Sequence, residues 1–306
     1  MSEQKTAYLK YIAALLLFGS NGIVASRIDL SSYEIVLLRT LIGSLLLIAI
    51  FCAGRNKFRF PRHKRQLAAL VVSGAAMGAS WMFLYEGYQQ TGVSVASLAY
   101  YCGPVIVMAL SPLLFREKLT ATKVVGFLAV LAGVFLVNGR VLLADGNGWG
   151  VFCGAMSAVM YALMVIANKK ARDITGLENA LLQLVIGFLT VAAFVGLKQG
   201  FVLHIAAEDW GPILLLGLVN TGVGCYLYFS AIGRLPVQTV AICGYLEPLS
   251  AVLLSVLLLH EVMLPWQIVG AALILGGAIF AEWRGSRRPQ SRPHLPAAHE
   301  EQQKLL

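Results

Sequence analysis

The sequence predicts an all-α integral membrane protein whose ten transmembrane helices form two inverted five-helix repeats. Three observations predict this fold. The composition is strongly apolar, ten apolar segments are long enough to cross a bilayer, and the two halves of the chain match at a constant register. Together they exclude a soluble globular domain.

The composition fits a protein that is solvated by lipid. Of the 306 residues, 58% are hydrophobic and 13% are charged, and the mean hydropathy is +0.75. Soluble domains carry about 25% charged residues, so this chain has too few charges to cover a soluble surface. The net charge of +9 does not indicate nucleic acid, because membrane proteins carry surplus Lys and Arg on cytoplasmic loops. We expect the lipid bilayer as a partner.

The apolar segments have the length that membrane helices need, which is about 20 residues. Their apolar runs are continuous, without the in–out alternation of a membrane β-barrel. The stretches between them are too short for a soluble domain. The tail at 283–306, with its Arg and Pro residues, is predicted to be disordered. The ten predicted spans are 8–26, 33–53, 66–87, 92–115, 120–138, 149–168, 177–197, 210–232, 237–259 and 264–282.

The positive charges predict the orientation. Of the 24 Lys and Arg residues, 20 fall in the tails and loops of one side, 3 fall on the other side, and Arg39 lies within a span. Lys and Arg accumulate on cytoplasmic loops, so both termini and the basic loop at 54–65 are predicted to be cytoplasmic. The predicted location is the plasma (inner) membrane, with the chain crossing it many times.

The two halves match at a constant offset of 144 residues, without a net gap. This register gives a first repeat at 8–139 and a second at 149–282. Because five is an odd number of helices, the second copy enters the membrane upside down. Inverted repeats are a common architecture of secondary transporters, which work by alternating access. Matched pairs include Glu34 and Glu178, Tyr101 and Tyr245, Pro104 and Pro248, Glu117 and Glu261, Gly126 and Gly270, and Gly133 and Gly277.

Glu247 lies near the middle of the ninth span, where a polar residue is costly and therefore a functional candidate. Pro248 follows it, and Pro104 holds the matching position in the fourth span. Since proline has no N–H, each is predicted to kink its helix, and the two kinked helices are predicted to flank one central cavity. Two interpretations of Glu247 stay open: a binding or gating site for cations or protons, or a structural partner of the kink.

Aromatic residues gather at a similar depth. Trp81 and Tyr85 share one face of the third span at a spacing of i and i+4. Further hydroxyl groups come from Tyr100, Tyr101, Tyr161, Tyr226, Tyr228 and Tyr245. Aromatic walls with few polar groups suit small amphipathic organic solutes, and ordinary helix packing is the alternative. Of these aromatic residues, the predicted substrate pathway includes Trp81, Tyr85, Tyr101, Tyr161 and Tyr245.

Two further polar residues lie inside predicted spans. Arg39 sits about two turns inside the second span, and we expect it to pair with Glu34 or Glu86; the alternative is that it faces an anionic group. Asn21 marks either a broken first helix that lines the pathway or a helix–helix hydrogen bond. Both residues join the predicted pathway.

No catalytic motif is present in the sequence. The chain has no P-loop, its five histidines form no H-E-x-x-H site, and its five cysteines form no C-x-x-C pair. We therefore expect no enzyme activity, no cofactor and no metal site. An intramembrane enzyme, the less favoured class, would need a nucleophile, a base or metal ligands clustered at one depth.

The stretch at 244–280 resembles the C-terminal signature of the EamA family, in the drug/metabolite transporter superfamily. The first repeat resembles it more loosely, and Gly103 stands where the family's acid precedes the first proline. The resemblance implies a ten-helix transporter of small metabolites, often an exporter of amino acids. The residues that carry it are Glu247, Pro248, Glu261, Gly270, Gly276 and Gly277, and in the first repeat Arg39, Thr40, Pro104, Glu117, Gly126 and Gly133.

The predicted function is secondary transport of small organic metabolites by alternating access, with amino-acid export as the first choice. A multidrug or cation efflux transporter is the alternative within this class, because an aromatic cavity with one acid suits cationic drugs equally. The sequence is compatible with uptake and with export. It is also compatible with proton coupling and with transport down the substrate gradient, and with a monomer and with an oligomer.

Overall fold

The computed structural model describes residues 3–58, 64–138, 148–198, 200–201, 203–259 and 265–283. Regular secondary structure in these ranges is helical throughout. Glu261 and the predicted tail beyond Trp283 lie outside them. In chain order the helices are α1 (Glu3–Gly19), α2 (Asn21–Ala25), α3 (Ser32–Ala53), α4 (Lys64–Tyr100), α5 (Gly103–Phe115), α6 (Ala121–Asn138), α7 (Gly148–Asn168), α8 (Gly176–Lys198), η3 (Ala207–Asp209), α9 (Trp210–Leu214), η4 (Leu215–Val223), α10 (Gly224–Ile232), α11 (Val237–Gly244), α12 (Leu246–Leu259) and α13 (Pro265–Trp283).

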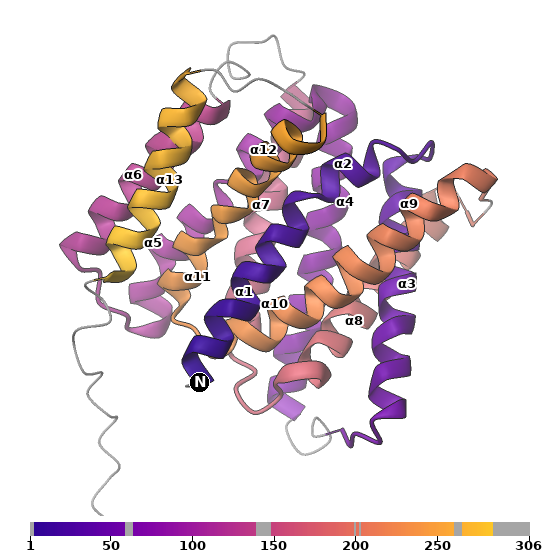
Figure 1. The fold of residues 1–306 in the computed structure, drawn as a ribbon. Coiled ribbons are helices and arrows are strands. Elements are labelled where there is room, and N and C mark those ends of the chain that lie inside the picture. Colours follow the sequence, from indigo (N-terminus) through magenta and orange to yellow (C-terminus); the bar gives the residue numbers. More distant parts are fainter. Residues whose placement is uncertain are drawn as a thin grey trace, which may run out of the picture.

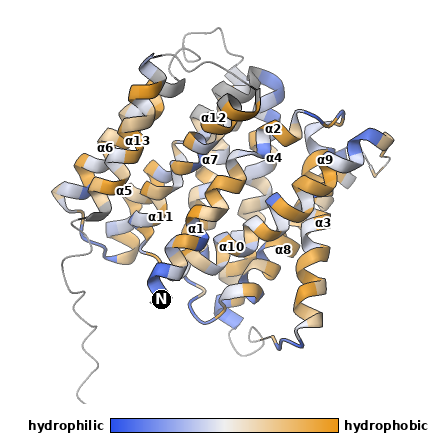
Figure 2. Ribbon diagram, in the orientation of Figure 1, coloured by the Kyte–Doolittle hydropathy of each residue, from blue (hydrophilic) through white to orange (hydrophobic). Residues whose placement is uncertain are grey.

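Six helical stretches of the described chain are long and apolar enough to cross a membrane. Helices α5, α6 and α13 are shorter but also apolar, and Figure 2 shows hydrophobic residues along most of the bundle. The all-helical membrane class is therefore supported, whereas the count of ten spans stays a prediction. The six stretches are Glu3–Ala25, Ser32–Ala53, Lys64–Gln90, Gly148–Asn168, Gly176–Lys198 and Ala207–Ile232.

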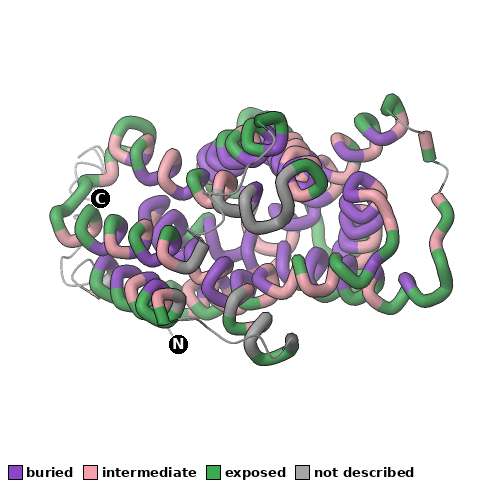
Figure 3. Tube along the Cα trace, turned by 90° about the horizontal axis from the view of Figure 1, so that it is seen from above, coloured by how far each residue is buried: buried purple, intermediate pink, exposed green. Residues whose placement is uncertain are grey.

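The helices run side by side between two ends of the molecule. In Figure 1 the N-terminus, the end of α3 and the α7–α8 connection lie towards the lower end, and the α2–α3 connection lies at the upper end. The segments at the lower end are those that the charge distribution predicts to be cytoplasmic. Viewed along the helices, buried residues lie in the interior and exposed residues around the outside (Figure 3). The outside is apolar, with Leu197 and Leu113 among its most exposed residues, as a lipid-facing surface requires.

The predicted boundaries of the fourth span are wrong. Helix α4 continues for 37 residues to Tyr100, which is about 55 Å at 1.5 Å per residue, so the first part of the predicted span 92–115 belongs to α4. The chain then turns at Tyr101 and Cys102 before α5 begins. The ninth span divides in the same way, because Tyr245 separates α11 from α12. Both interruptions fall at positions that the 144-residue register matches.

The prolines stand at helix beginnings, not at kinks inside helices as predicted. Pro104 is in the first turn of α5, and Pro248 is the third residue of α12. The first N–H groups of a helix have no partner within the helix, so a proline without N–H is tolerated there. Each proline therefore lies at the start of a new helix that follows a break.

Two more spans depart from regular α-helix. The first is interrupted at Ser20, between α1 and α2, so the predicted break at Asn21 is present. The eighth contains a π-helical stretch of nine residues, η4, between α9 and α10. Stretches of π-helix inside α-helices are rare and occur often at functional sites.

Helices α6 and α13 pack through two pairs of glycines. A side chain on Gly126 would lie 2.6 Å from the Gly277 carbonyl oxygen, and one on Gly133 would lie 2.5 Å from that of Gly270. No Cβ atom fits at such distances, so only glycine allows these two backbones to approach. Gly126 matches Gly270, and Gly133 matches Gly277, in the 144-residue register. The register therefore maps the contact between Gly126 and Gly277 onto the contact between Gly270 and Gly133, and the reverse.

Candidate functional site

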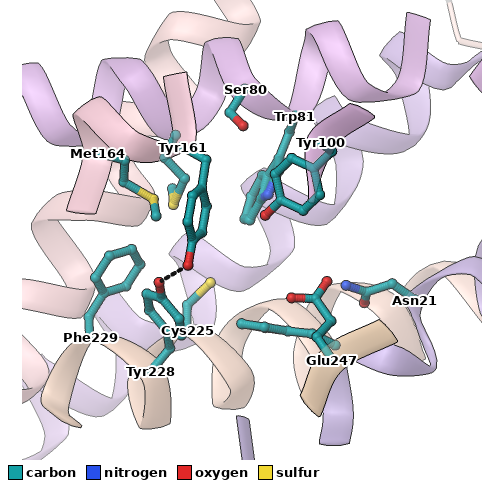
Figure 4. Close-up of a pocket in the computed structure, with 12 residues that line it drawn as sticks. Asn21, Ser80, Trp81, Tyr100, Tyr161, Met164, Cys225, Tyr228, Phe229 and Glu247 are labelled. Atoms are coloured by element: carbon teal, nitrogen blue, oxygen red, sulfur yellow. Dashed lines mark hydrogen bonds between the residues drawn. The ribbon is translucent and has the colours of Figure 1, made fainter. Parts of the chain in front are cut away.

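A cavity lies between the α1–α2 junction and helices α4, α7, α10 and α12 (Figure 4). Aromatic rings and sulfur-containing side chains form most of its wall, and Glu247 is the one charged side chain among the described lining residues. Such a lining suits a small solute that is largely apolar and carries few polar groups. The lining residues are Phe18, Asn21, Met77, Ser80, Trp81, Tyr100, Tyr161, Met164, Cys225, Tyr228, Phe229 and Glu247.

Glu247 is the second residue of α12, directly after the break at Tyr245. Its carboxylate points into the cavity in Figure 4. Within the described chain it makes no hydrogen bond or ion pair, and the Arg39 guanidinium acts on it only through its field. An acid among aromatic rings loses much of its hydration, so a positively charged group of a solute would be stabilised beside it.

Tyrosine hydroxyls converge near the same cavity. The Tyr161 and Tyr228 hydroxyl oxygens lie 3.4 Å apart, and the ring of Tyr100 meets that of Tyr161 edge-on at 5.5 Å. Behind them, Tyr11 is fully buried and donates a 2.8 Å hydrogen bond to the Val240 carbonyl. The wall opposite Glu247 therefore combines ring faces with hydroxyl groups that either donate or accept.

Asn21 occupies the edge of the cavity because the first span breaks at Ser20. Asn220, from the π-helical stretch, donates to the Asn21 side-chain oxygen at 3.0 Å. It also donates to Ser20 Oγ at 2.7 Å and to the Leu17 carbonyl at 3.1 Å. Both predicted alternatives for Asn21 thus hold together: a broken first helix beside the cavity and a helix–helix hydrogen bond.

The predicted pairing of Arg39 with an acid is wrong. The buried guanidinium donates from Nε to Thr221 Oγ1 and from one terminal nitrogen to the Tyr85 hydroxyl, each at 2.9 Å. It lies over the Trp81 ring, 4.6 Å from the centroid, and its other terminal nitrogen has no hydrogen-bond partner. Neutral acceptors and a ring face hold this cation, and the two predicted acids bind other groups.

Those two acids stabilise the end of the bundle opposite the N-terminus. Glu34 forms a capping box with Ser31 at the start of α3. Glu86 accepts hydrogen bonds from the Tyr33 hydroxyl and from Trp149 Nε1, the latter at 3.4 Å. Lys198 donates to the same Tyr33 hydroxyl at 2.9 Å. This network joins α3, α4, α7 and α8 at one end of the bundle.

At the other end, Glu117 binds the beginning of α11. Its two carboxylate oxygens accept from the backbone N–H groups of Val237 and Gln238, at 2.8 and 3.1 Å. A carboxylate is favoured at a helix N-terminus, where several N–H groups point outward. Lys169 donates to the Leu235 carbonyl just before this helix. The connection between α10 and α11 is therefore held from both sides.

The ten predicted pathway residues separate into three groups. Four of them, Asn21, Trp81, Tyr161 and Glu247, line the cavity. Arg39 and Tyr85 lie behind Trp81 and bind each other. The remaining four, Tyr101, Pro104, Tyr245 and Pro248, lie at the two helix breaks.

Sequence analysis named Tyr100 and Tyr228 among the aromatic residues but left them out of the predicted pathway, and it missed Asn220. Tyr100 and Tyr228 line the cavity, and Asn220 holds its edge. The signal for Asn220 was present, since it is a buried amide within an apolar span and such residues are costly in lipid. The sequence gives no sign of the π-helical turn that directs it.

A bundle of apolar helices around a lined cavity is the architecture of a membrane transporter. The sequence pattern of the EamA-like transporter family matches residues 5–139 and again residues 148–283. The chain belongs to the EamA-like transporter family, which confirms the resemblance seen in the sequence.

Relatives match along nearly the whole chain. The chain is 26% identical to transporter YxxF of Bacillus subtilis (strain 168), over 90% of this chain and 89% of the relative. It is 25% identical to protein RarD of Streptomyces exfoliatus, over 97% and 95%. It is 28% identical to a protein of Streptantibioticus cattleyicolor named "Probable terminal-alkyne amino-acid exporter", over 88% and 92%. A solved crystal structure with 20% identity superimposes with a TM-score of 0.80, over 94% of this chain and all of the other, which shows the same fold.

Proposed function

We propose that this chain is a secondary transporter that exports amino acids across the plasma membrane by alternating access. Ten helices in two inverted five-helix repeats enclose the substrate site, and both termini face the cytoplasm. The substrate binds in the cavity, with its positively charged amine beside Glu247 and its apolar side chain against the aromatic wall.

The observation that carries this proposal is the unpaired Glu247 carboxylate, the one charged side chain among the described residues that line the cavity. Both proposed repeats contribute to the wall, since Trp81 and Tyr100 come from the first and Tyr161 and Tyr228 from the second. A site between two repeats is where inverted-repeat transporters bind their substrates. The name of the S. cattleyicolor relative supports amino acids as the substrate class.

Alternating access is supported by contacts that relate the two repeats. The glycine contacts between α6 and α13 exchange with each other under the 144-residue register, as expected of a pseudo-twofold axis. Glu117, from the first repeat, holds the start of α11 in the second. Release of that contact would free the connection between α11 and α10, and α10 forms part of the cavity wall.

A multidrug or cation efflux transporter is the second candidate, and the same cavity favours it. Among its described lining residues no arginine, lysine or histidine is present, so nothing there repels a cationic drug. Coupling to protons through Glu247 belongs to both candidates, because a carboxylate that binds a cation also binds a proton.

The test is counterflow of radiolabelled L-phenylalanine, L-leucine and L-threonine in proteoliposomes, with ethidium as the cationic comparison. We expect amino-acid counterflow by the wild type and at least tenfold slower counterflow, without pH dependence, by Glu247→Gln. This substitution keeps the shape and the hydrogen bonding but removes the charge and the titration.

Glu208→Gln is the matched control, because Glu208 is an exposed acid of the α8–α9 connection, and it should transport like the wild type. Transport of ethidium without any amino acid would favour the second candidate. A fully active and pH-responsive Glu247→Gln would remove this residue from the proposed site.

A further inference from the structure

Two asparagines at the cavity edge fix each other's amide orientation. Asn220 Nδ2 lies 3.1 Å from the Leu17 carbonyl oxygen. A carbonyl only accepts hydrogen bonds, so the amide group of Asn220 that faces it must be the NH2 group. The same nitrogen lies 3.0 Å from the side chain of Asn21. Asn21 must therefore present its oxygen to Asn220, and its own NH2 group points the other way.

The NH2 group of Asn21 faces the cavity wall that carries Glu247. Figure 4 shows the Asn21 amide nitrogen directed toward the Glu247 carboxylate, and both residues line the cavity. A fixed hydrogen-bond donor thus lies beside a fixed acceptor. An α-amino acid offers the complementary arrangement, because its ammonium group and its carboxylate are bonded to the same carbon atom.

The π-helical stretch η4 places Asn220 at this position. Asn220 is 2% exposed, and the side-chain hydroxyl of the next residue, Thr221, donates to the Leu216 carbonyl at 2.8 Å. Thr221 also accepts from Arg39 at 2.9 Å. Asn220 thus binds the α1–α2 break, and the adjacent Thr221 binds α3 on the other side. The wider turn, anchored by Arg39, keeps Asn220 directed at Asn21.

We propose that Asn21 binds the carboxylate of the substrate and that Asn220 is the positioning residue that orients it. The inference rests on the proposed amino-acid transport and narrows it. The site takes zwitterionic α-amino acids with apolar side chains in preference to amines, which leave the Asn21 amide without an acceptor. It also disfavours carboxylic acids without an amine, because they bring a second negative charge to Glu247.

Three probes with the same side chain test this proposal: L-phenylalanine, 2-phenylethylamine and 3-phenylpropionate. Equilibrium binding of each is measured by titration calorimetry on the purified full-length protein in detergent. We expect the wild type to bind L-phenylalanine at least tenfold more tightly than either of the other two.

Asn220→Asp is the decisive variant. Aspartate has the same shape but no N–H, so it accepts from Asn21 and turns the Asn21 amide, which then presents its oxygen to the cavity. We expect the preference for L-phenylalanine over 2-phenylethylamine to fall at least tenfold, while the amine binds as well as to the wild type or better. Retained amine binding is itself proof that the variant is folded. Asn21→Ala should lose the same preference, and it carries the test if Asn220→Asp does not fold.

Three results would overturn the inference: a wild type that binds the amine as tightly as the amino acid, variants that keep the wild-type preference, or no binding of any probe. Equal binding of amine and amino acid, together with intact amino-acid counterflow, would overturn the role of Asn21 alone. Absence of counterflow for every amino acid would instead overturn the proposed function.

Discussion

The Tyr245 hydroxyl donates a 2.7 Å hydrogen bond to the Tyr101 carbonyl, and these residues are 144 positions apart, the offset of the internal repeat. Each lies at the interruption of a long helical segment, Tyr101 after α4 and Tyr245 between α11 and α12. A carbonyl at a helix break in lipid needs a partner, because no water is available there. One break thus supplies the donor for the other, and both lie next to cavity residues, Tyr100 and Glu247.

Tyr245→Phe removes this donor and keeps the buried ring. Loss of this hydrogen bond should cost about 1 kcal/mol and lower the melting temperature in detergent. Transport should fall as well, because the two breaks are no longer tied together. Tyr226→Phe is the control, since the partly exposed Tyr226 contacts Lys10 through its ring face, which phenylalanine retains. Equal melting temperatures for Tyr245→Phe and wild type would contradict the role of this hydrogen bond.

Pro104→Ala and Pro248→Ala should each slow transport several-fold while the protein still inserts. Alanine supplies an N–H that can reach the carbonyl four residues earlier, and this allows each pair of helices to fuse across its break. Transport per inserted molecule is measured in proteoliposomes. Pro112→Ala is the matched control, because Pro112 lies inside α5 and away from the breaks. Unchanged transport in both variants would leave the prolines as features of packing.

Glu117→Gln should open the predicted cytoplasmic end. An NH2 group, which cannot accept from a backbone N–H, replaces one of the two carboxylate oxygens, and the charge that favours the start of α11 is lost. Cys225, which lines the cavity, reports the change in a background without the other cysteines. Its labelling by a membrane-impermeant reagent from the cytoplasmic side should become several-fold faster than in wild type. Slower or equal labelling would mean that Glu117 does not hold this end closed.

Lys169 should give the protein a pH-dependent stability. Burial lowers the pKa of Lys169 to about 8, and Arg172 contributes in the same direction, whereas Glu117 opposes them. An unfolded lysine keeps its proton up to a pH of about 10.4. Between these values the unfolded state binds more protons, so stability rises with pH across this window.

Lys169→Met removes this titration. The rise in melting temperature from pH 8 to pH 10 should be smaller in the variant than in the wild type. Lys170→Met, at the exposed neighbouring position, should keep the wild-type profile. Identical profiles for wild type and Lys169→Met would show that this buried amine does not titrate in the window.

The topology is tested by single cysteines in a cysteine-free background. Asn56→Cys lies in the basic loop after α3, and Glu208→Cys lies in the α8–α9 connection; both positions are exposed. An impermeant thiol reagent should label Asn56→Cys only from the cytoplasmic side and Glu208→Cys only from the outside. Labelling of both from the same side would be incompatible with two inverted repeats of five helices.

Much of the fold follows from the sequence, because the preference of a segment for lipid is a sum over its own residues. Each predicted span falls on helix in the described chain, and the 144-residue register pairs Tyr101 with Tyr245, which a hydrogen bond joins in the structure. The exact form of the breaks was predicted less well. A proline shows that a helix cannot continue unchanged, but its neighbours decide between a kink and a new helix.

The partners of polar side chains could not be predicted in the same way. Arg39 was expected to pair with an acid, yet it binds Thr221, which is 182 residues away in sequence. A membrane helix is apolar around its whole circumference, so its sequence pattern does not show which face turns inward. A π-helical turn takes more residues than an α-helical turn, so it changes the face that its residues present, and Asn220 meets Asn21 from within such a stretch.

The sequence by itself thus determined that the chain is a membrane protein, that it contains a repeat, and that Glu247 is the candidate acid of the substrate pathway. These are properties of composition and of order along the chain. Only the tertiary structure decided that Asn21, Trp81 and Glu247 meet at one cavity while Tyr85 lies behind it. That choice depends on the rotation and depth of each helix against its neighbours, which close packing of the assembled bundle fixes.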